Sequence, residues 1–148
     1  MSLEKYRLDR IVMQSQDGSV YNAVRAMESN HIGLVVVADH GRVTGVLTDR
    51  DVALRVVSFQ LDPTQTALRD VMTEQPATLP IEASEQQALE LMRDRHVRRI
   101  PLLENDTVVG LVTVDDLLLS QTADLELLRE VVRAQLAEPA AFKAKGEL

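Results

Sequence analysis

The chain has no cysteine and no tryptophan, and it holds only two phenylalanines and two tyrosines among 148 residues. Without cysteine it has no disulfide framework, no thiolate ligand for a metal ion and no cysteine nucleophile, which fits a reducing compartment. Aromatic residues make up only 3% of the chain. A bound ligand is therefore not expected to be held by stacking on rings.

Hydrophobic runs and basic charge are also scarce. No stretch of about 18 consecutive apolar residues occurs, and residues 1–5 lack the basic flank and apolar run of an export signal. The formal net charge is -7, from 16 Lys and Arg against 23 Asp and Glu, which disfavours attraction to a phosphate backbone. We therefore expect a cytoplasmic protein with neither a membrane nor nucleic acid as its main partner.

Motifs typical of catalytic sites are missing as well. The sequence contains no GxSxG, no P-loop and no HExxH, and it offers no plausible pair of nucleophile and base. Its only imidazoles are His31, His40 and His96. These absences give catalysis little support, and nucleotide hydrolysis is kept as the enzymatic alternative.

The main feature that is present is an internal repeat. A shift of 65 positions places residues 45–51 on residues 110–116 without a gap, and eight residues match over the 35 positions that start at Asp17 and Glu82 and end at Asp51 and Asp116. The matching pairs are Ser19/Ser84, Ala23/Ala88, Met27/Met92, His31/His96, Val43/Val108, Gly45/Gly110, Thr48/Thr113 and Asp51/Asp116. Three of them lie within one GxxTxxD window. Packing alone rarely demands a threonine and an aspartate, so the window suggests a repeated site.

Hydrophobic periodicity predicts the order β-α-β-β-α in each half. In the first half we expect a strand over residues 6–13, a turn over 14–18, a helix over 20–30 capped by Ser19, strands over 34–38 and 43–47, and a helix over about 49–59. In the second half we expect a strand over residues 76–80, a helix that opens with a capping box of Ser84 and Gln87, and strands over 100–103 and 108–112.

An amphipathic helix over residues 124–136 and a frayed tail over 138–148 are expected after the second half. The predicted division is a first repeat at 1–59, a linker at 60–69, a second repeat at 70–122, and a C-terminal helix and tail at 123–148. Neither hairpin can bury its apolar face within so small a repeat, so we expect the two halves to pack on each other.

The repeated window has two interpretations. Thr48 followed by Asp51 resembles a capping box, whose loss costs about 1 kcal/mol and implies no ligand. Alternatively, the hydroxyl and the free amides at the helix start receive a phosphate. Two like charges about 4 Å apart repel by roughly 4 kcal/mol at an effective dielectric constant near 20, so the aspartate must face something else. Its two acceptor oxygens suit the diol of a ribose, and the window therefore suits a nucleotide or nucleoside.

With these motifs the chain resembles tandem CBS domain pairs, also called Bateman modules. The resemblance covers about residues 6–122 and is carried by GVLTDRD with VALR after it, by RDVMT in the linker, and by RHVRRIPLL ahead of the second hairpin. It implies an α+β fold of two β-α-β-β-α CBS repeats related by a pseudo-two-fold axis, with the C-terminal helix added. It also implies a regulatory module that binds AMP, ADP, ATP or S-adenosylmethionine in two clefts between the repeats.

The resemblance assigns the clefts residue by residue. One cleft combines Thr48, Asp51, Thr73, Ala77 and Val97, and the other combines Thr113, Asp116, Val12 and Ile32. Arg98 and Arg99 align with Gly33 and Leu34, so a cationic supplement exists on one side only. We therefore expect the cleft with Asp51 and Arg98 to bind a phosphorylated ligand more tightly.

The cations near Arg98 have a simpler interpretation. Arg93, Arg95, His96, Arg98 and Arg99 crowd the end of a predicted helix, where cations complement the helix dipole without binding phosphate. No metal site is expected, because neighbouring acids such as Asp115 and Asp116 diverge on a helix. No covalent cofactor is expected either.

Three function classes follow, with a sensor of adenosyl ligands preferred. The competing class is a structural dimerisation domain in which both windows only cap helices, and an enzyme is the third. The resemblance implies a homodimer and an unknown regulated protein. The helix over 124–136 either caps that dimer, docks the regulated protein or folds back on the core. The sequence leaves the nucleotide, the occupied cleft, the target and the dimer geometry open.

Overall fold

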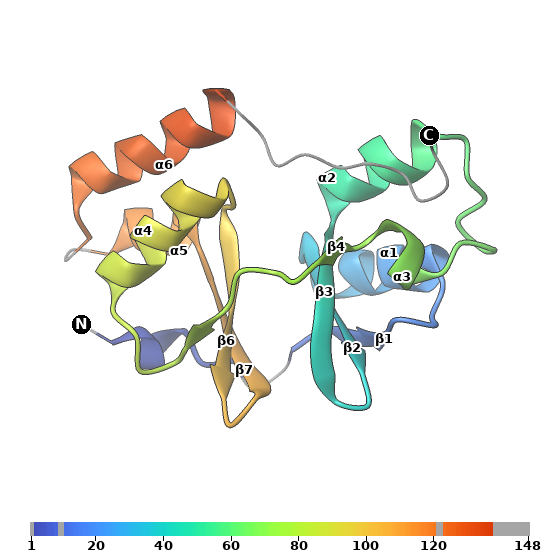
Figure 1. Ribbon diagram of the computed structural model, residues 1–148, viewed down its shortest axis with the longest axis horizontal. Coiled ribbons are helices and arrows are strands. Elements are labelled where there is room, and N and C mark those ends of the chain that lie inside the picture. Colours follow the sequence, from blue (N-terminus) through green and yellow to red (C-terminus); the bar gives the residue numbers. More distant parts are fainter. Residues whose placement is uncertain (1, 9–10, 121–122, 138–148) are drawn as a thin grey trace. The chain divides into compact units, whose positions relative to one another are not determined.

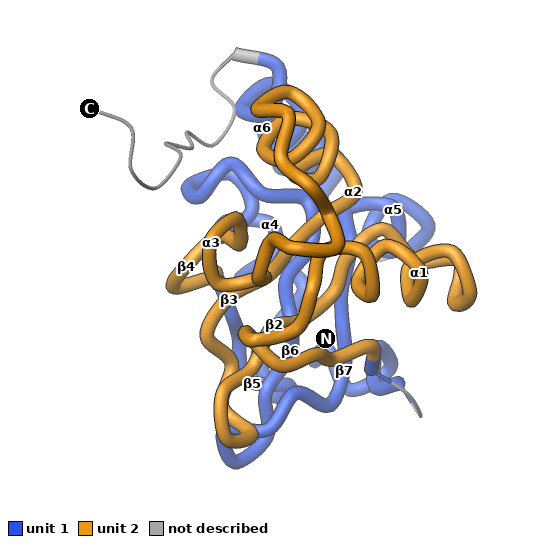
Figure 2. The backbone as a smooth tube through the Cα atoms, turned by 90° about the vertical axis from the view of Figure 1, so that its right-hand side faces the viewer, with its two compact units in different colours: residues 1–11, 77–141 blue, residues 12–76, 142–148 orange. Residues whose placement is uncertain are grey.

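The computed structural model describes residues 2–8, 11–120 and 123–137 (Figure 1). The chain forms two compact units, and each is described by itself (Figure 2). Among the described residues, unit 2 consists of residues 12–76, whereas unit 1 combines the start of the chain, up to Ile11, with residues from Ala77 onward. The units therefore group residues differently from the linear repeats, because the segment ahead of each repeat belongs to the unit of the other.

Unit 2 is a four-stranded sheet in the order β1-β2-β3-β4 with helices against it. Its elements are β1 (Met13–Ser15), α1 (Val20–Asn30), β2 (Leu34–Asp39), β3 (Arg42–Thr48), α2 (Asp49–Asp51), η2 (Val52–Val57), α3 (Leu68–Val71) and β4 (Thr73–Glu74). Strand β1 is parallel to β2, and the other neighbours are antiparallel. The core lies between the helices and the sheet, where Val20 and Ala23 of α1 meet Val35 of β2 and Leu47 of β3.

Unit 1 follows a similar plan, with a three-stranded sheet and one additional helix. Its elements are η1 (Leu3–Tyr6), β5 (Leu79–Pro80), α4 (Glu85–Arg95), β6 (Arg99–Glu104), β7 (Thr107–Thr113), α5 (Val114–Leu119) and α6 (Leu125–Ala137). The sheet order is β5-β6-β7, with β5 parallel to β6 and β6 antiparallel to β7. Helix α6 packs along α4 and α5 (Figure 1), and this helix has no counterpart in the described part of unit 2.

The first helix of each unit begins and ends as its local sequence dictates. The Ser19 side chain accepts from the Asn22 amide, and Ser84 forms the predicted capping box with Gln87. Both helices end at a histidine in the left-handed region, with φ of 51° at His31 and 56° at His96. The predicted helix over 20–30, both predicted hairpins and the C-terminal helix are confirmed.

Two predictions at the start of the chain are wrong in whole or in part. The strand expected over residues 6–13 is replaced by the 3-10 helix η1 and by β1 (Met13–Ser15), which also takes the first two residues of the turn expected over 14–18. The rest of that turn is confirmed, and the Gly18 amide donates to the Ser15 carbonyl at 2.9 Å. The start of the chain contributes to both units. Leu3 is fully buried in the core of unit 1, whereas the backbone carbonyl of Val12 accepts a hydrogen bond from the Val36 amide of unit 2 at 3.0 Å. One continuous strand could not belong to both units.

The helix expected over about 49–59 is also different in detail. It has one α-helical turn, α2, and continues as the π-helix η2. The amide of Ser58 bonds to the carbonyl of Ala53, five residues earlier, at 3.0 Å. Within η2 the Arg55 side chain turns inward and is only 5% exposed. The predicted tail over 138–148 lies outside the described residues, which contain no helix long and apolar enough to cross a membrane.

Candidate functional site

Both GxxTxxD windows form the same reciprocal pair of hydrogen bonds. The Thr48 hydroxyl accepts from the Asp51 amide at 3.1 Å, and the Thr48 amide donates to Asp51 Oδ2 at 3.0 Å. Thr113 and Asp116 repeat these bonds at 3.1 and 3.0 Å. The capping interpretation is therefore confirmed as geometry in both units. The bonds also hold each hydroxyl beside its carboxylate in a defined orientation.

The glycine of each window lets a distant backbone segment lie against the strand. A Cβ atom on Gly45 would lie 2.8 Å from the Thr73 carbonyl oxygen, and one on Gly110 would lie 2.6 Å from the Tyr6 carbonyl oxygen. Gly45 pairs with β4, and Gly110 forms a bridge with Arg7. The matched glycines thus serve chain packing, and only the threonine and the aspartate remain to be explained by a ligand.

The two windows differ in what lies beside the carboxylate. In unit 2, Asp51 Oδ1 is 3.2 Å from Arg55 Nη2, and Arg55 Nη1 donates to the Val71 carbonyl at 2.9 Å. Burial lowers the pKa of Arg55, and the charge of Asp51 opposes that shift. In unit 1, the position equivalent to Arg55 is Ser120. Among the described residues no cation forms an ion pair with Asp116.

The other predicted site residues are divided between the units. Unit 2 holds Thr48, Asp51, Thr73, Val12 and Ile32, whereas unit 1 holds Ala77, Val97, Arg98, Thr113 and Asp116. Thr73 lies in β4 opposite Val46, and the Arg98 carbonyl accepts from Val114 at 2.9 Å, one residue after Thr113. Ala77 is buried and Val97 packs against the unit 1 core. The grouping of Asp51 with Arg98 joins residues of different units and stays a prediction.

Each unit has a groove next to its window. The unit 2 groove, of about 610 Å³, is lined by residues that include Val24, Met27, Glu28, His31, Asp49 and Val52, with the predicted site residue Ile32 among them. The unit 1 groove, of about 370 Å³, is lined by residues that include Arg98, Val114, Asp115, Leu118, Leu125 and Arg129. Sequence reasoning missed both grooves, and the repeated histidine would have pointed only to the unit 2 groove, which His31 lines.

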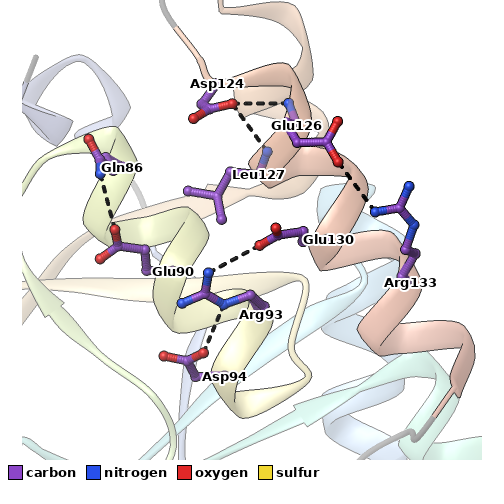
Figure 3. A network of polar contacts seen from close by, with 9 residues as sticks. All are labelled: Gln86, Glu90, Arg93, Asp94, Asp124, Glu126, Leu127, Glu130 and Arg133. Atoms are coloured by element: carbon purple, nitrogen blue, oxygen red, sulfur yellow. Dashed lines mark hydrogen bonds and ion pairs between the residues drawn. The ribbon is translucent and has the colours of Figure 1, made fainter.

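Part of the cationic cluster at the end of α4 is used within unit 1. Arg93 Nε lies 2.9 Å from Asp94 Oδ1, and Arg93 Nη1 lies 3.1 Å from Glu130 Oε2 on α6 (Figure 3). These two hydrogen bonds raise the pKa of Arg93. His96 Nδ1 lies 3.0 Å from the carbonyl oxygen of Ala134, so this nitrogen is the donor. Arg93 and His96 therefore hold α6, whereas Arg98 is exposed and lines the unit 1 groove.

The acidic residues near the windows do not gather around one point. No group of three or more His, Asp or Glu side chains that could hold a metal ion occurs in the part of the chain that the structure describes. What the windows offer is a hydroxyl that can still donate and a carboxylate oxygen beyond the one used in the box. This is the chemistry of a hydrogen-bonding site for a polyhydroxylated or phosphorylated small molecule.

Comparison with known proteins agrees with this architecture. The sequence profile described as CBS domain matches residues 15–58 and 68–121. The Bacillus subtilis (strain 168) protein YlbB is 36% identical over 105 residues, which cover 70% of each chain.

Two solved structures share the fold. The CBS domain protein TA0289 from Thermoplasma acidophilum matches with a TM-score of 0.84 at 20% identity, over 98% of this chain and 82% of that one. PAE2072 from Pyrobaculum aerophilum, solved in complex with AMP, matches with a TM-score of 0.76 at 22% identity, over 87% and 99% of the two chains.

Proposed function

We propose that this chain, which belongs to the CBS domain family, is a regulatory module that binds an adenosyl ligand and signals its presence to a partner protein. The observation that carries the proposal is the duplicated pair of hydroxyl and carboxylate, held by the same two hydrogen bonds in both units. The AMP complex of the structural neighbour PAE2072 supports the choice of an adenosyl ligand.

The capping boxes are compatible with ligand binding and prepare for it. A threonine hydroxyl that accepts from an amide still has its own hydrogen to donate to a phosphate oxygen. The aspartate uses Oδ2 in the box, and its other oxygen can accept from a ribose hydroxyl. Because the box fixes both side chains before a ligand arrives, little conformational entropy is lost on binding.

We propose that Asp116 is the stronger ribose acceptor. Asp51 already shares its Oδ1 with the buried Arg55, whereas Asp116 has no cationic partner among the described residues. A ribose hydroxyl therefore competes with an ion pair only in unit 2. This proposal concerns the sugar, and the expectation that Asp51 with Arg98 favours phosphate is kept as a separate proposal.

A thermal unfolding screen with AMP, ADP, ATP, S-adenosylmethionine and NADH tests the function. A ligand that binds only the folded state stabilises it by about 2.7 kcal/mol at a hundredfold excess over its Kd. Asp116→Ala should abolish or strongly reduce the shift. Asp116→Asn is the matched control for stability, since its amide oxygen can still accept from the Thr113 amide while the charge is removed. If none of these compounds raises the melting temperature, the sensor proposal fails.

A second function is favoured by the same boxes. A structural dimerisation domain needs only that both windows cap helices, and they do so in both units. The two functions differ in the response of the aspartate variants. If the chain is a scaffold, Asp51→Ala and Asp116→Ala should destabilise it modestly and leave any ligand-induced shift in melting temperature unchanged. If it is a sensor, the same variants should lose that shift while the fold is retained.

The proposed partners are a second copy of the chain and an unidentified regulated protein. Large apolar side chains are exposed on α5 and α6 of unit 1: Leu118, Leu119, Leu125, Val132 and Leu136. Exposed apolar clusters of this kind often mark protein interfaces. We propose this surface, named the α5–α6 face, for homodimerisation, and a cytoplasmic location from the cysteine-free composition.

A further inference from the structure

Helix α6 shows how one unit binds an amphipathic helix. Its Leu127, Leu128 and Val131 are buried in the unit 1 core. In that core they join Leu89 and Met92 of α4 and Leu117 of α5, which are fully buried. A polar pair at the edge orients the helix, with Arg93 bonded to Glu130 at 3.1 Å (Figure 3).

The unit 2 groove is the equivalent surface without the helix. With the repeat shift of 65 positions, Val24 corresponds to Leu89, Met27 to Met92, Val52 to Leu117 and His31 to His96. All four residues line the unit 2 groove. Leu89 is fully buried, whereas Val24 is 37% exposed. The unit 2 groove is therefore lined at the positions that correspond to the α6-binding residues of unit 1, and its apolar side chains are partly open to solvent.

The charges at the edge of the groove differ from those of unit 1. Glu28 stands where unit 1 has Arg93, and Asp49 stands where unit 1 has Val114. Both acids are exposed and line the unit 2 groove. Glu28 is paired with Arg25 at 2.6 Å, but both side chains are more than half exposed, so this pair contributes little to stability and can be exchanged for another. A fitting helix must carry a cation where α6 carries Glu130.

We propose that the unit 2 groove binds an amphipathic helix of another protein that has a lysine or arginine at the position of Glu130. Its apolar residues would follow the spacing of Leu127, Leu128 and Val131, which is the pattern that fills the equivalent surface of unit 1. The α6 helix of a second copy is a poor occupant because Glu130 would face Glu28. The proposal concerns the regulated partner and does not depend on nucleotide binding.

A labelled peptide with the sequence of residues 124–137 and the substitution Glu130→Lys tests the proposal. The full chain should bind this peptide in a fluorescence anisotropy titration, and the unsubstituted peptide should bind about fivefold more weakly, as expected for a single exposed ion pair. The chain variant Glu28→Arg should reverse this preference. Val24→Asp should weaken binding of the substituted peptide about tenfold. High salt should reduce the difference between the two peptides.

Glu82→Arg, at an exposed position of unit 1, is the matched control because it changes the net charge by the same amount. It should leave the preference between the peptides unchanged. The proposal is overturned if neither peptide binds, or if Glu28→Arg leaves the preference as it was. It is also overturned if the chain is a dimer that Val24→Asp converts to a monomer, because a second copy then occupies the groove.

Discussion

Asp51 and Asp116 illustrate how one repeated residue has different surroundings in the two units. Each closes a capping box, but only Asp51 also faces a guanidinium, since the side chain of Arg55 is 6% exposed and 3.2 Å from it. Removing a carboxylate from beside a buried cation costs more than the loss of a helix cap. The equivalence in sequence therefore does not extend to energetics.

We predict that Asp51→Ala destabilises the protein by about 3 kcal/mol, and Asp116→Ala by about 1 kcal/mol. Urea unfolding followed by circular dichroism measures both. The double variant Asp51→Ala with Arg55→Leu removes the buried cation together with its carboxylate and should recover much of the loss. Equal losses for the two single variants would contradict the structural role given to Arg55.

Tyr6 and Lys5 predict how stability responds to alkaline pH. Burial, followed by the charge of Glu85, raises the pKa of Tyr6 above its ordinary value of 10.0. The hydrogen bond to Glu85 raises the pKa of Lys5 above 10.5. A pKa that is higher in the folded state stabilises the protein below the unfolded value, and this contribution is lost as the pH rises through the folded value.

Stability should therefore decline as the pH rises above about 10, which urea midpoints measured from pH 8 upward would detect. Tyr6→Phe should make the decline shallower. Tyr21→Phe, at an exposed ring 48% accessible to solvent, should leave the slope unchanged. The same slope in both variants would show that the Tyr6 hydroxyl does not contribute.

Among the elements, α6 has two apolar sides with different roles. Leu127, Leu128 and Val131 pack into unit 1, which settles one of the alternatives from the sequence: this side of the helix folds back on the core. Leu125, Val132 and Leu136 are exposed on the other side. The helix can therefore complete its own unit and still offer a surface to a partner.

We predict that Leu128→Ala destabilises unit 1 by about 3 kcal/mol, because it leaves a cavity in the core. Leu125→Ala should change stability by less than about 0.5 kcal/mol. The two leucines are 6% and 59% exposed, so they form a matched pair. Thermal unfolding with both variants checks the difference, and similar losses would mean that α6 is not docked as described.

At the scale of the whole molecule, the α5–α6 face predicts an oligomer. Leu119 and Leu136 are 84% and 81% exposed, which is unfavourable for a chain that remains alone in water. We expect sedimentation velocity to show a dimer and the double variant Leu119→Glu with Leu136→Glu to be a monomer with an unchanged melting profile at low concentration. Gln86→Glu with Ser29→Glu, at exposed positions of α4 and α1, is the charge control, because it adds the same two negative charges. A dimer that survives the double variant would exclude this face.

Much of the fold was predictable because its signals are local. The spacing of Val20, Ala23 and Met27 predicts a helix. A serine or threonine followed three residues later by a glutamine or aspartate predicts the N-cap of a helix. The repeat and the fold class follow from the same short-range patterns, and the structure confirms them. The π-helical course of η2 was missed, because nothing in its sequence distinguishes it from a regular amphipathic helix.

What the sequence determined by itself was therefore the duplicated set of helices, hairpins and capping boxes, whose contacts join residues a few positions apart. Only the tertiary structure decided that Leu3 completes the core of unit 1, that Arg55 reaches the Val71 carbonyl beside Asp51, and that one of two equivalent surfaces holds α6. These features depend on which distant segments meet. Hydrophobic burial stabilises contacts between distant segments according to the apolar area that they bury. Such contacts have no fixed spacing in the sequence, so the sequence pattern does not predict them.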